Sequence, residues 1–475
     1  MINLLKRDIM KNRYYIRNFV LVALTMLLSV TALAQEALRT GYFLDGNAYR
    51  YRINPAMTGD QNFISFPLLG NINVNTAGNL GLANFIYNAP GGKNLVTFMH
   101  PSVEADDFLG AIEKDNRFST NFDLTLFSTG FRAFGGYNTI DLGVHSRSAM
   151  NLPYSMFEFM KVMGNKDYSI RNLNLTTNNY VDIALGHSHK VTRDITVGAR
   201  LKFLLGVGYA DVLFDRIDLS LNGRQWKVNA QGSASIAIGG EFTHDADKNG
   251  VVDGYDNIVP GVNGFGLGVD MGVTYDLSNV LTDGLVVSAS LNDVGFMNWN
   301  KVAKAGISND SPFVFDGFEN ISMNGDVSGA SIEEQFDALG DDLEEFLTLK
   351  DMGTGSEGKA LSATLNVGVE YSMPFYKNLS VGALYTSRFD EIYPLHQFSL
   401  MANIAPVKWF DLAVSGTASN MGAGFGAMAN LHLTGFNLFV GTDCFIGKVS
   451  KEFIPLNNTN SSVSLGINIP FGKRK

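Results

Sequence analysis

The chain has 475 residues, of which 45% are hydrophobic and only 17% are charged, and its formal net charge is −10 at pH 7. Soluble proteins average about 25% charged residues, so a chain of this composition can bury much of its surface or expose it to lipid without long helices. The acidic balance argues against a nucleic-acid partner. A single cysteine, Cys444, excludes a disulfide framework and a thiolate metal cluster, and we expect it to lie in an apolar strand and pack as a small hydrophobic side chain.

Residues 1–34 have the three parts of a secretory signal peptide. Basic side chains cluster in residues 6–17, an apolar core follows at residues 19–28, and Ala-Leu-Ala at residues 32–34 is a small-residue cleavage site. We expect an exported protein that begins at Gln35, and an uncleaved signal anchor is the alternative. No later stretch has the roughly 18 consecutive apolar residues of a transmembrane helix, so the exported chain folds either in the periplasm or as a closed outer-membrane barrel.

Between the signal peptide and residue 240, apolar residues repeatedly alternate with polar or small ones, as in strands with two unlike faces. The apolar positions fall in Ile72 to Thr76, Phe122 to Leu126, Ile140 to Val144, Val181 to Leu185 and Ile195 to Phe203. The other face of the last strand carries Arg200 and Lys202. His187 and His189 share one strand face, but no third ligand has suitable spacing, so we expect ordinary polar residues there rather than a metal site.

Two short segments in this part of the chain predict helices, at residues 102–115 and 153–162. The second opens with Pro153 and is apolar nearly all round, with Phe157 near its centre. Methionines make such a surface adaptable. Two interpretations stay open: the helix lines or gates a hydrophobic route through a lumen, or it is a packed plug that holds the lumen shut.

Residues 245–256, DADKNGVVDGYD, have the spacing of an EF-hand-like calcium loop. The expected ligands are the side chains of Asp245, Asp247, Asn249, Asp253 and Asp256 and the backbone carbonyl of Val251. Gly250 supplies the sharp bend at the sixth position, whereas Asp256 stands where a bidentate Glu is usual. We expect an extracellular loop ordered by Ca²⁺, and an acidic surface turn is the alternative.

The clearest alternating stretch is residues 264–275, GFGLGVDMGVTY. Phe265, Leu267 and their alternate neighbours form an apolar face, while three glycines, Asp270 and Thr274 form the other. At about 3.3 Å per residue and a tilt of about 40°, the stretch crosses about 25 Å, the height of the apolar band on an outer-membrane barrel. One face therefore suits lipid and the other a polar interior.

Residues 299–359 are too long for a periplasmic turn, so we expect an extracellular loop. Ser331 and Glu334 form a capping box, and apolar residues recur at helical spacing from Ile332 to Phe346, with acidic residues on the opposite face. Either this helix caps the barrel mouth or docks a partner, or it only packs its apolar stripe onto neighbouring loops.

The alternation continues to the end of the chain. It covers residues 361–371, 379–385, 398–404, 410–415, 425–431, 436–440 and 463–471. The final strand resembles the signal by which barrel-assembly machinery recognises its clients. We expect an all-β fold for residues 35–475: a transmembrane antiparallel up-and-down β-barrel of about 14–16 strands, with short helices in loops or lumen and extracellular loops at about residues 240–262 and 299–359. A soluble sandwich usually has fewer and shorter strands.

Four segments occur in an order that resembles a family of bacterial outer-membrane barrels known only as a domain of unknown function. They are GYFLDGNAYRYRINPAMTG (residues 41–59), FISFPLLGNINV (63–74), LPYSMFEFMK (152–161) and SLNDVGFMNW (290–299). The triplet Asn54-Pro55-Ala56 is also similar to the long-chain fatty acid transporter superfamily, whose barrels pass hydrophobic molecules. The resemblance implies fold and location, and it implies no reaction.

We expect a porin-like barrel in the outer membrane of a Gram-negative bacterium that passes small or hydrophobic molecules, restricted by the helix near Phe157 and by extracellular loops. The alternative is a non-transporting scaffold of a secretion or surface-assembly complex. The expected partners are outer-membrane lipid, the barrel-assembly machinery and a hydrophobic small-molecule ligand, and Ca²⁺ is the one cofactor expected. Because the chain has no nucleophile elbow, HExxH motif or phosphate loop, we expect neither an enzyme nor catalytic residues.

Overall fold

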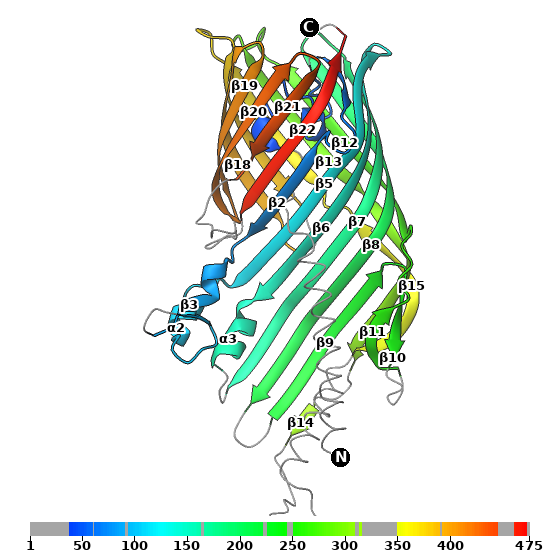
Figure 1. Cartoon of the computed structure of the whole chain (residues 1–475), viewed down its shortest axis with the longest axis vertical. Helices are drawn as coiled ribbons and strands as arrows, with labels where there is room; N and C mark the ends of the chain where they lie inside the picture. The colour runs from blue at the N-terminus through cyan, green and yellow to red at the C-terminus, as the bar shows by residue number, and fades with distance from the viewer. Residues whose placement is uncertain are drawn as a thin grey trace, which may run out of the picture.

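The computed structural model describes residues 38–472 except residues 60, 91–93, 163–165, 222–225, 245–249, 309–312, 316–348, 390–391 and 445–459. The chain forms a closed antiparallel barrel (Figure 1). Its wall has 14 strand positions, because β1 and β2 together occupy one of them. Both of these segments pair with β22 on one side and with β5 on the other, which closes the barrel. The predicted fold class is confirmed.

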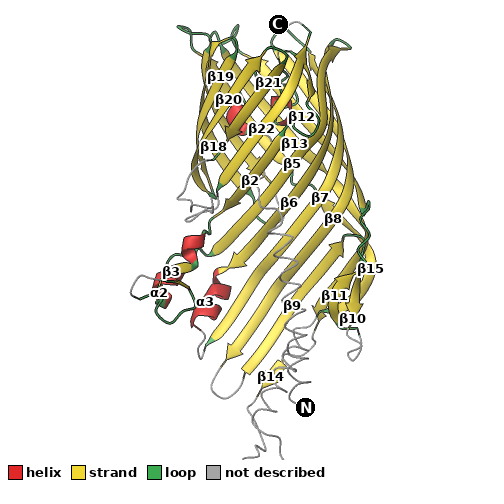
Figure 2. Ribbon diagram, in the orientation of Figure 1, coloured by secondary structure: helices red, strands yellow, loops and turns green. Residues whose placement is uncertain are grey.

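The wall strands follow one another around the barrel in chain order (Figure 2). They are β1 (Asn62–Ser65), β2 (Ile72–Gly78), β5 (Asp115–Ala133), β6 (Gly136–Pro153), β7 (Asp167–Lys190), β8 (Ile195–Leu221), β12 (Gly264–Asp276), β13 (Leu285–Ser308), β16 (Thr364–Ser372), β17 (Leu379–Arg388), β18 (Leu395–Val407), β19 (Phe410–Ser419), β20 (Gly422–Leu433), β21 (Phe436–Thr442) and β22 (Ser461–Phe471). Among the helices within the described part of the chain, none has the length and apolar character needed to span a bilayer.

Strand β12 shows how the sequence sets the two faces of the wall. Phe265, Leu267 and Met271 are exposed on the outer face, whereas Gly268 and Asp270 are buried on the inner face. An apolar outer face replaces water contacts with lipid contacts, and an inner face of small and polar residues leaves room and hydrogen-bonding groups in the lumen. The two faces predicted for this strand are confirmed.

The two ends of the barrel differ because the connections differ in length. Strands β5 and β6 are joined by Phe134 and Gly135 alone, and both have positive φ angles (55° and 74°), as a tight hairpin turn requires. By the general rule for such barrels, the short-turn end faces the periplasm. At the opposite, long-loop end the wall is uneven, because β7 and β8 have 24 and 27 residues whereas β21 has 7.

Additional strands extend the tall side of the wall. They are β9 (Trp226–Ala237), β14 (Phe313–Phe315), β15 (Lys350–Ala360) and the hairpin β10 (Glu241–His244) with β11 (Val252–Asp256). Strand β9 pairs with β8 and with the far end of β13, and β15 also pairs with β13. Because these partners satisfy its backbone groups, β13 continues to Ser308, and the first part of the expected loop at residues 299–359 is strand.

A small lobe projects from the long-loop end beside the short side of the wall (Figure 1). It contains η3 (Leu82–Asn84), β3 (Ile86–Asn88), β4 (Leu95–Thr97), α2 (Ala105–Leu109) and α3 (Tyr154–Val162). Phe157 of α3 is buried in its centre, with ring centroids 5.7 Å from Phe85 and 6.0 Å from Phe108. The helix is therefore present as predicted, but both interpretations of it as an element of the lumen are wrong, because Phe157, Met156 and Met160 pack against the other residues of the lobe.

Candidate functional site: a plugged and charged lumen

Residues 38–59, the N-terminal plug, lie inside the barrel near its short-turn end (Figure 1). The plug has only two short turns of 3₁₀-helix, η1 (Arg39–Gly41) and η2 (Arg50–Arg52). Its aromatic side chains enter two apolar clusters with wall residues: Tyr49 lies in one with Phe439, and Tyr42 lies in the other with Leu384. Of the short helices expected in loops or lumen, α2 and α3 lie in the lobe, and the lumen contains only these two 3₁₀ turns among the described residues of the plug.

Backbone groups of the plug bond to side chains of the wall, because the plug has little secondary structure to satisfy them internally. The N–H groups of Arg39 and Thr40 donate to the Asp443 carboxylate at 2.8 and 2.6 Å. The Ile53 carbonyl accepts hydrogen bonds from Ser290 Oγ and Asn292 Nδ2, both at 2.6 Å. These bonds hold the plug at both ends of its path across the lumen.

The Asn54-Pro55-Ala56 triplet is a docking point of the plug. Asn54 has no exposed surface; its Oδ1 accepts from the Ala56 N–H at 3.0 Å, and its Nδ2 donates to the Ala289 carbonyl at 3.3 Å. The triplet can approach the wall only because Gly198 and Gly272 face it, and a Cβ at either glycine would collide with Asn54 or Pro55.

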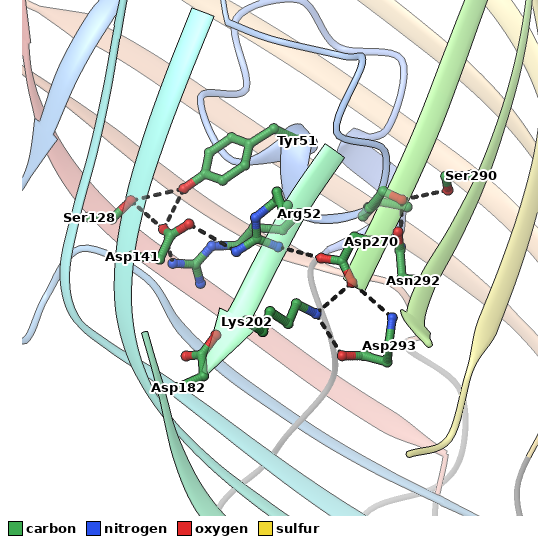
Figure 3. A network of polar contacts seen from close by, with 12 residues as sticks. Tyr51, Arg52, Ser128, Asp141, Asp182, Lys202, Asp270, Ser290, Asn292 and Asp293 are labelled. Atoms are coloured by element: carbon green, nitrogen blue, oxygen red, sulfur yellow. Dashed lines mark hydrogen bonds and ion pairs between the residues drawn. The ribbon is translucent and has the colours of Figure 1, made fainter. Parts of the chain in front are cut away.

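Buried charges connect the plug to three wall strands, β6, β8 and β12. Arg200 lies 2.9 Å from both Asp141 and Asp270, and Asp141 also contacts Arg52 of the plug at 2.9 Å. Lys202 continues the chain of contacts at 2.8 Å from Asp270. Figure 3 shows the carboxylate of Asp141 also accepting a hydrogen bond from the Tyr51 hydroxyl, at 2.6 Å. Burying a charged group costs its hydration free energy, which several ionic and hydrogen-bonding partners together can offset. Each member of this network therefore depends on the others for its position.

A β-bulge places two successive residues of β13 in this network. Asn292 and Asp293 interrupt the register opposite Asp270, and Asp293 has a positive φ of 55°. Neighbouring residues of a regular strand face opposite sides of the sheet. With the bulge, Asn292 binds the plug, while Asp293 lies 2.6 Å from Lys202 and donates its N–H to Asp270 at 2.8 Å.

A second charged cluster lies on β5, β6 and β7. His145 is held between two carboxylates, with Nε2 at 2.9 Å from Asp182 and Nδ1 bonded to Asp123. Arg147 lies 3.3 Å from the same Asp123 oxygen. The ring of Tyr180 stacks on His145, with the centroids 4.9 Å apart. The lumen is therefore lined by alternating positive and negative groups.

Three adjoining cavities lie in the lumen. The first, of about 70 Å³, contacts the plug at Arg52 and Ile53 and the charged residues described above. The second, of about 90 Å³, shares Arg147, Tyr180 and Asp293 with the first. The third, of about 60 Å³, shares Ser119, Asn121 and Arg388 with the second. The shared lining residues place the three cavities next to one another. No described residue of α3 lines any of them.

The calcium loop stays a prediction. Asp245, Asp247 and Asn249 lie outside the described residues, as does the acidic helix expected at residues 331–346. Val251 forms a backbone bridge to Lys350, and Asp253 and Asp256 belong to strand β11. The described portion of the chain contains no group of three or more His, Cys, Asp or Glu residues placed to hold a metal ion. His187 bonds to Asn138 at 2.9 Å, as an ordinary polar residue does.

Cys444 is the second residue after the end of β21 instead of lying within an apolar strand. It lies beside Asp443, the residue that binds the plug backbone, and it lines the third cavity. Burial raises the pKa of the Cys444 thiol to about 11, and the neighbouring Asp443 carboxylate adds to the shift. The thiol is therefore protonated and unreactive at neutral pH.

Comparison with known proteins gives one family and several similar structures. No curated protein matches the chain. Similar solved structures are the Ralstonia pickettii toluene transporter TbuX (10% identity, 93% of this chain and 96% of that chain, TM-score 0.42), the P. putida toluene transporter TodX (11%, 88% and 93%, TM-score 0.41) and a Pseudomonas aeruginosa FadL homologue (11%, 93% and 99%, TM-score 0.41). Residues 55–443 match the family described as Family of unknown function (DUF5723), and the chain belongs to this family.

Proposed function

We propose that the protein is a solute channel of the outer membrane, in which the three cavities form the route and the N-terminal plug closes it. The observation that carries the proposal is the series of adjoining cavities in the lumen, the first of which is lined by Arg52 and Ile53 of the plug. A tightly packed lumen stabilises a barrel that serves only as a scaffold. Open cavities in the lumen therefore favour a route for solutes over a scaffold. The charged first cavity selects small polar or amphipathic solutes over bulk hydrocarbon.

The plug moves as a unit in this proposal. Its contacts with the wall, which are the hydrogen bonds, ion pairs and two apolar clusters described above, are all non-covalent, and its covalent link to the wall is the chain leading into β1 (Asn62–Ser65). Displacement of residues 38–59 toward the short-turn end would join the first cavity to the periplasm.

A reversible disulfide tests this mechanism. Thr40 Oγ1 of the plug lies 2.8 Å from Ser415 Oγ of β19, a separation that suits replacement of both residues by cysteine. The variant Thr40→Cys/Ser415→Cys is made in a Cys444→Ser background and reconstituted into liposomes, and the influx of small sugars, amino acids and organic acid salts is followed by swelling. We expect flux above that of empty liposomes under reducing conditions, at least a tenfold loss on oxidation, and recovery with reductant.

The two single-cysteine variants are the matched controls, and neither should respond to oxidation. Wild-type liposomes without flux, or a locked variant with undiminished flux, would overturn the proposal. Absence of flux together with a stoichiometric protein partner on crosslinking would instead support the scaffold alternative.

A further inference from the structure

The inner face of β5 passes all three cavities in order. From the start of the strand every second side chain faces the lumen, because a strand has a period of two. Asp115 and Arg117 line an open groove of about 670 Å³, Ser119 and Asn121 line both the third and the second cavity, and Asp123 lines the first. At about 3.4 Å per residue this stretch spans about 27 Å. One strand face therefore leads from the groove to the cavity that contacts the plug.

The groove lies at the long-loop end, where the small lobe stands beside the short side of the wall (Figure 1). Asn84 and Ala111 of the lobe line one side of it, and Asn420 and Met421, in the turn between β19 and β20, line the other. Met421 also lines the third cavity, as does Gly422. These shared residues place the groove next to the third cavity.

Arg117 stands at the boundary between the groove and the third cavity. Its guanidinium carbon lies 5.1 Å from the ring centroid of Tyr393, which lines the third cavity. Its Nε is buried without a hydrogen-bond partner among the described residues, and none of the ion pairs found within the described part of the chain involves it. The other charged residues of the groove, Glu113, Lys114 and Asp115, are exposed. Because water and salt screen exposed charges, the partly buried guanidinium sets the local field.

We propose that the groove is the outer mouth of the route and that Arg117 makes this mouth selective for small anions over cations. A fixed cation at a narrow passage stabilises a passing anion and repels a cation of the same size. Asp443, the one carboxylate among the described lining residues of the third cavity, accepts hydrogen bonds from two N–H groups of the plug, which offset part of its charge. This inference rests on the proposed function, because it gives the channel an entrance and names the class of solute that the channel prefers.

Solutes that differ in charge test the role of Arg117. Wild-type protein, Arg117→Gln and Arg117→Lys are reconstituted into liposomes, and the uptake of radiolabelled methanesulfonate, erythritol and tetramethylammonium is measured; these are a small anion, a neutral molecule and a cation. We expect the wild-type protein to admit methanesulfonate at least tenfold faster than tetramethylammonium. Arg117→Gln should reduce this ratio at least fivefold without changing erythritol uptake, whereas Arg117→Lys should preserve the ratio because it keeps the charge.

Arg171→Gln is the matched control, because Arg171 lies on β7 outside the groove and is paired with Asp218 at 2.8 Å. It should leave the uptake ratio unchanged. Equal uptake of the anion and the cation by the wild-type protein, or an unchanged ratio in Arg117→Gln, would overturn the inference. If Arg117→Gln does not fold, the wild-type ratio and the blocking experiment below still decide.

Blocking the groove tests its role as the mouth. Ala111→Cys, at an exposed position of the groove, is made in a Cys444→Ser background, labelled in detergent with a polyethylene glycol maleimide and then reconstituted. Labelling should reduce the uptake of all three solutes at least fivefold, whereas labelled Lys227→Cys, at an exposed position of β9, should take them up as before. Undiminished uptake through labelled Ala111→Cys would refute this mouth and leave the channel standing. Absence of uptake by the unlabelled wild-type protein would refute the channel and this inference with it.

Discussion

Arg200 joins two wall carboxylates and thereby the plug to the barrel. The variant Arg200→Met leaves Asp141 and Asp270 buried with one cationic partner fewer, and we expect a loss of about 3–5 kcal/mol in the free energy of unfolding. Arg171→Met, which removes a half-exposed pair with Asp218 at 2.8 Å, is the control and should cost less than about 1 kcal/mol. Denaturant titration in detergent measures both, and equal losses would contradict a special role for the buried network.

Several residues of this network were predictable individually but not as a site. Alternation alone places Arg200, Lys202 and Asp270 on the inner face, because a strand has a period of two. Nothing in the pattern shows that Arg200 meets Asp141, which is 59 residues away, since that depends on the register of three strands. The alternation does not predict that Asp293 faces inward, because a bulge directs it there. Its position in the motif SLNDVGFMNW is the sequence feature that could have indicated it.

At the scale of elements, the sequence predicts the strands and the positions of the helices, but not the surroundings against which the helices pack. The apolar face of each strand follows from lipid contact, so β12 and its relatives lie where alternation predicts them. The apolar character of α3 does not distinguish a lumen from a lobe, because either environment buries it. The pairing of β13 with β9 and β15, which lengthens the wall, joins residues 44 to 77 positions apart, and local patterns do not encode such contacts.

Strand β12 offers a test of the route along the lumen. A Cβ at Gly268 would approach Leu361, a lining residue of the second cavity, to 3.2 Å. Gly268→Leu should therefore reduce solute flux several-fold while the barrel still folds. The control is Leu267→Phe on the outer face of the same strand, which should leave flux unchanged. Undiminished flux in Gly268→Leu would exclude passage along this wall.

At the scale of the whole molecule, exposed apolar side chains surround the barrel, among them Phe398, Leu400 and Phe425. Such a surface requires lipid or detergent. We expect the protein to stay in the membrane pellet after a carbonate wash and to migrate anomalously in unheated gels, as closed barrels do. Release of the folded protein into the carbonate supernatant would contradict the membrane fold.

The interrupted first wall strand has a consequence for biogenesis. The first and last wall positions meet in two short ladders, Asn62 to Ser65 with Phe471 to Asn468 and Ile72 to Thr76 with Leu465 to Ser461. Residues 66–71 divide them. The plug precedes the first ladder by two residues, so the same stretch of chain holds the plug and closes the barrel. Closure of the barrel and placement of the plug at the short-turn end of the lumen are therefore linked in assembly.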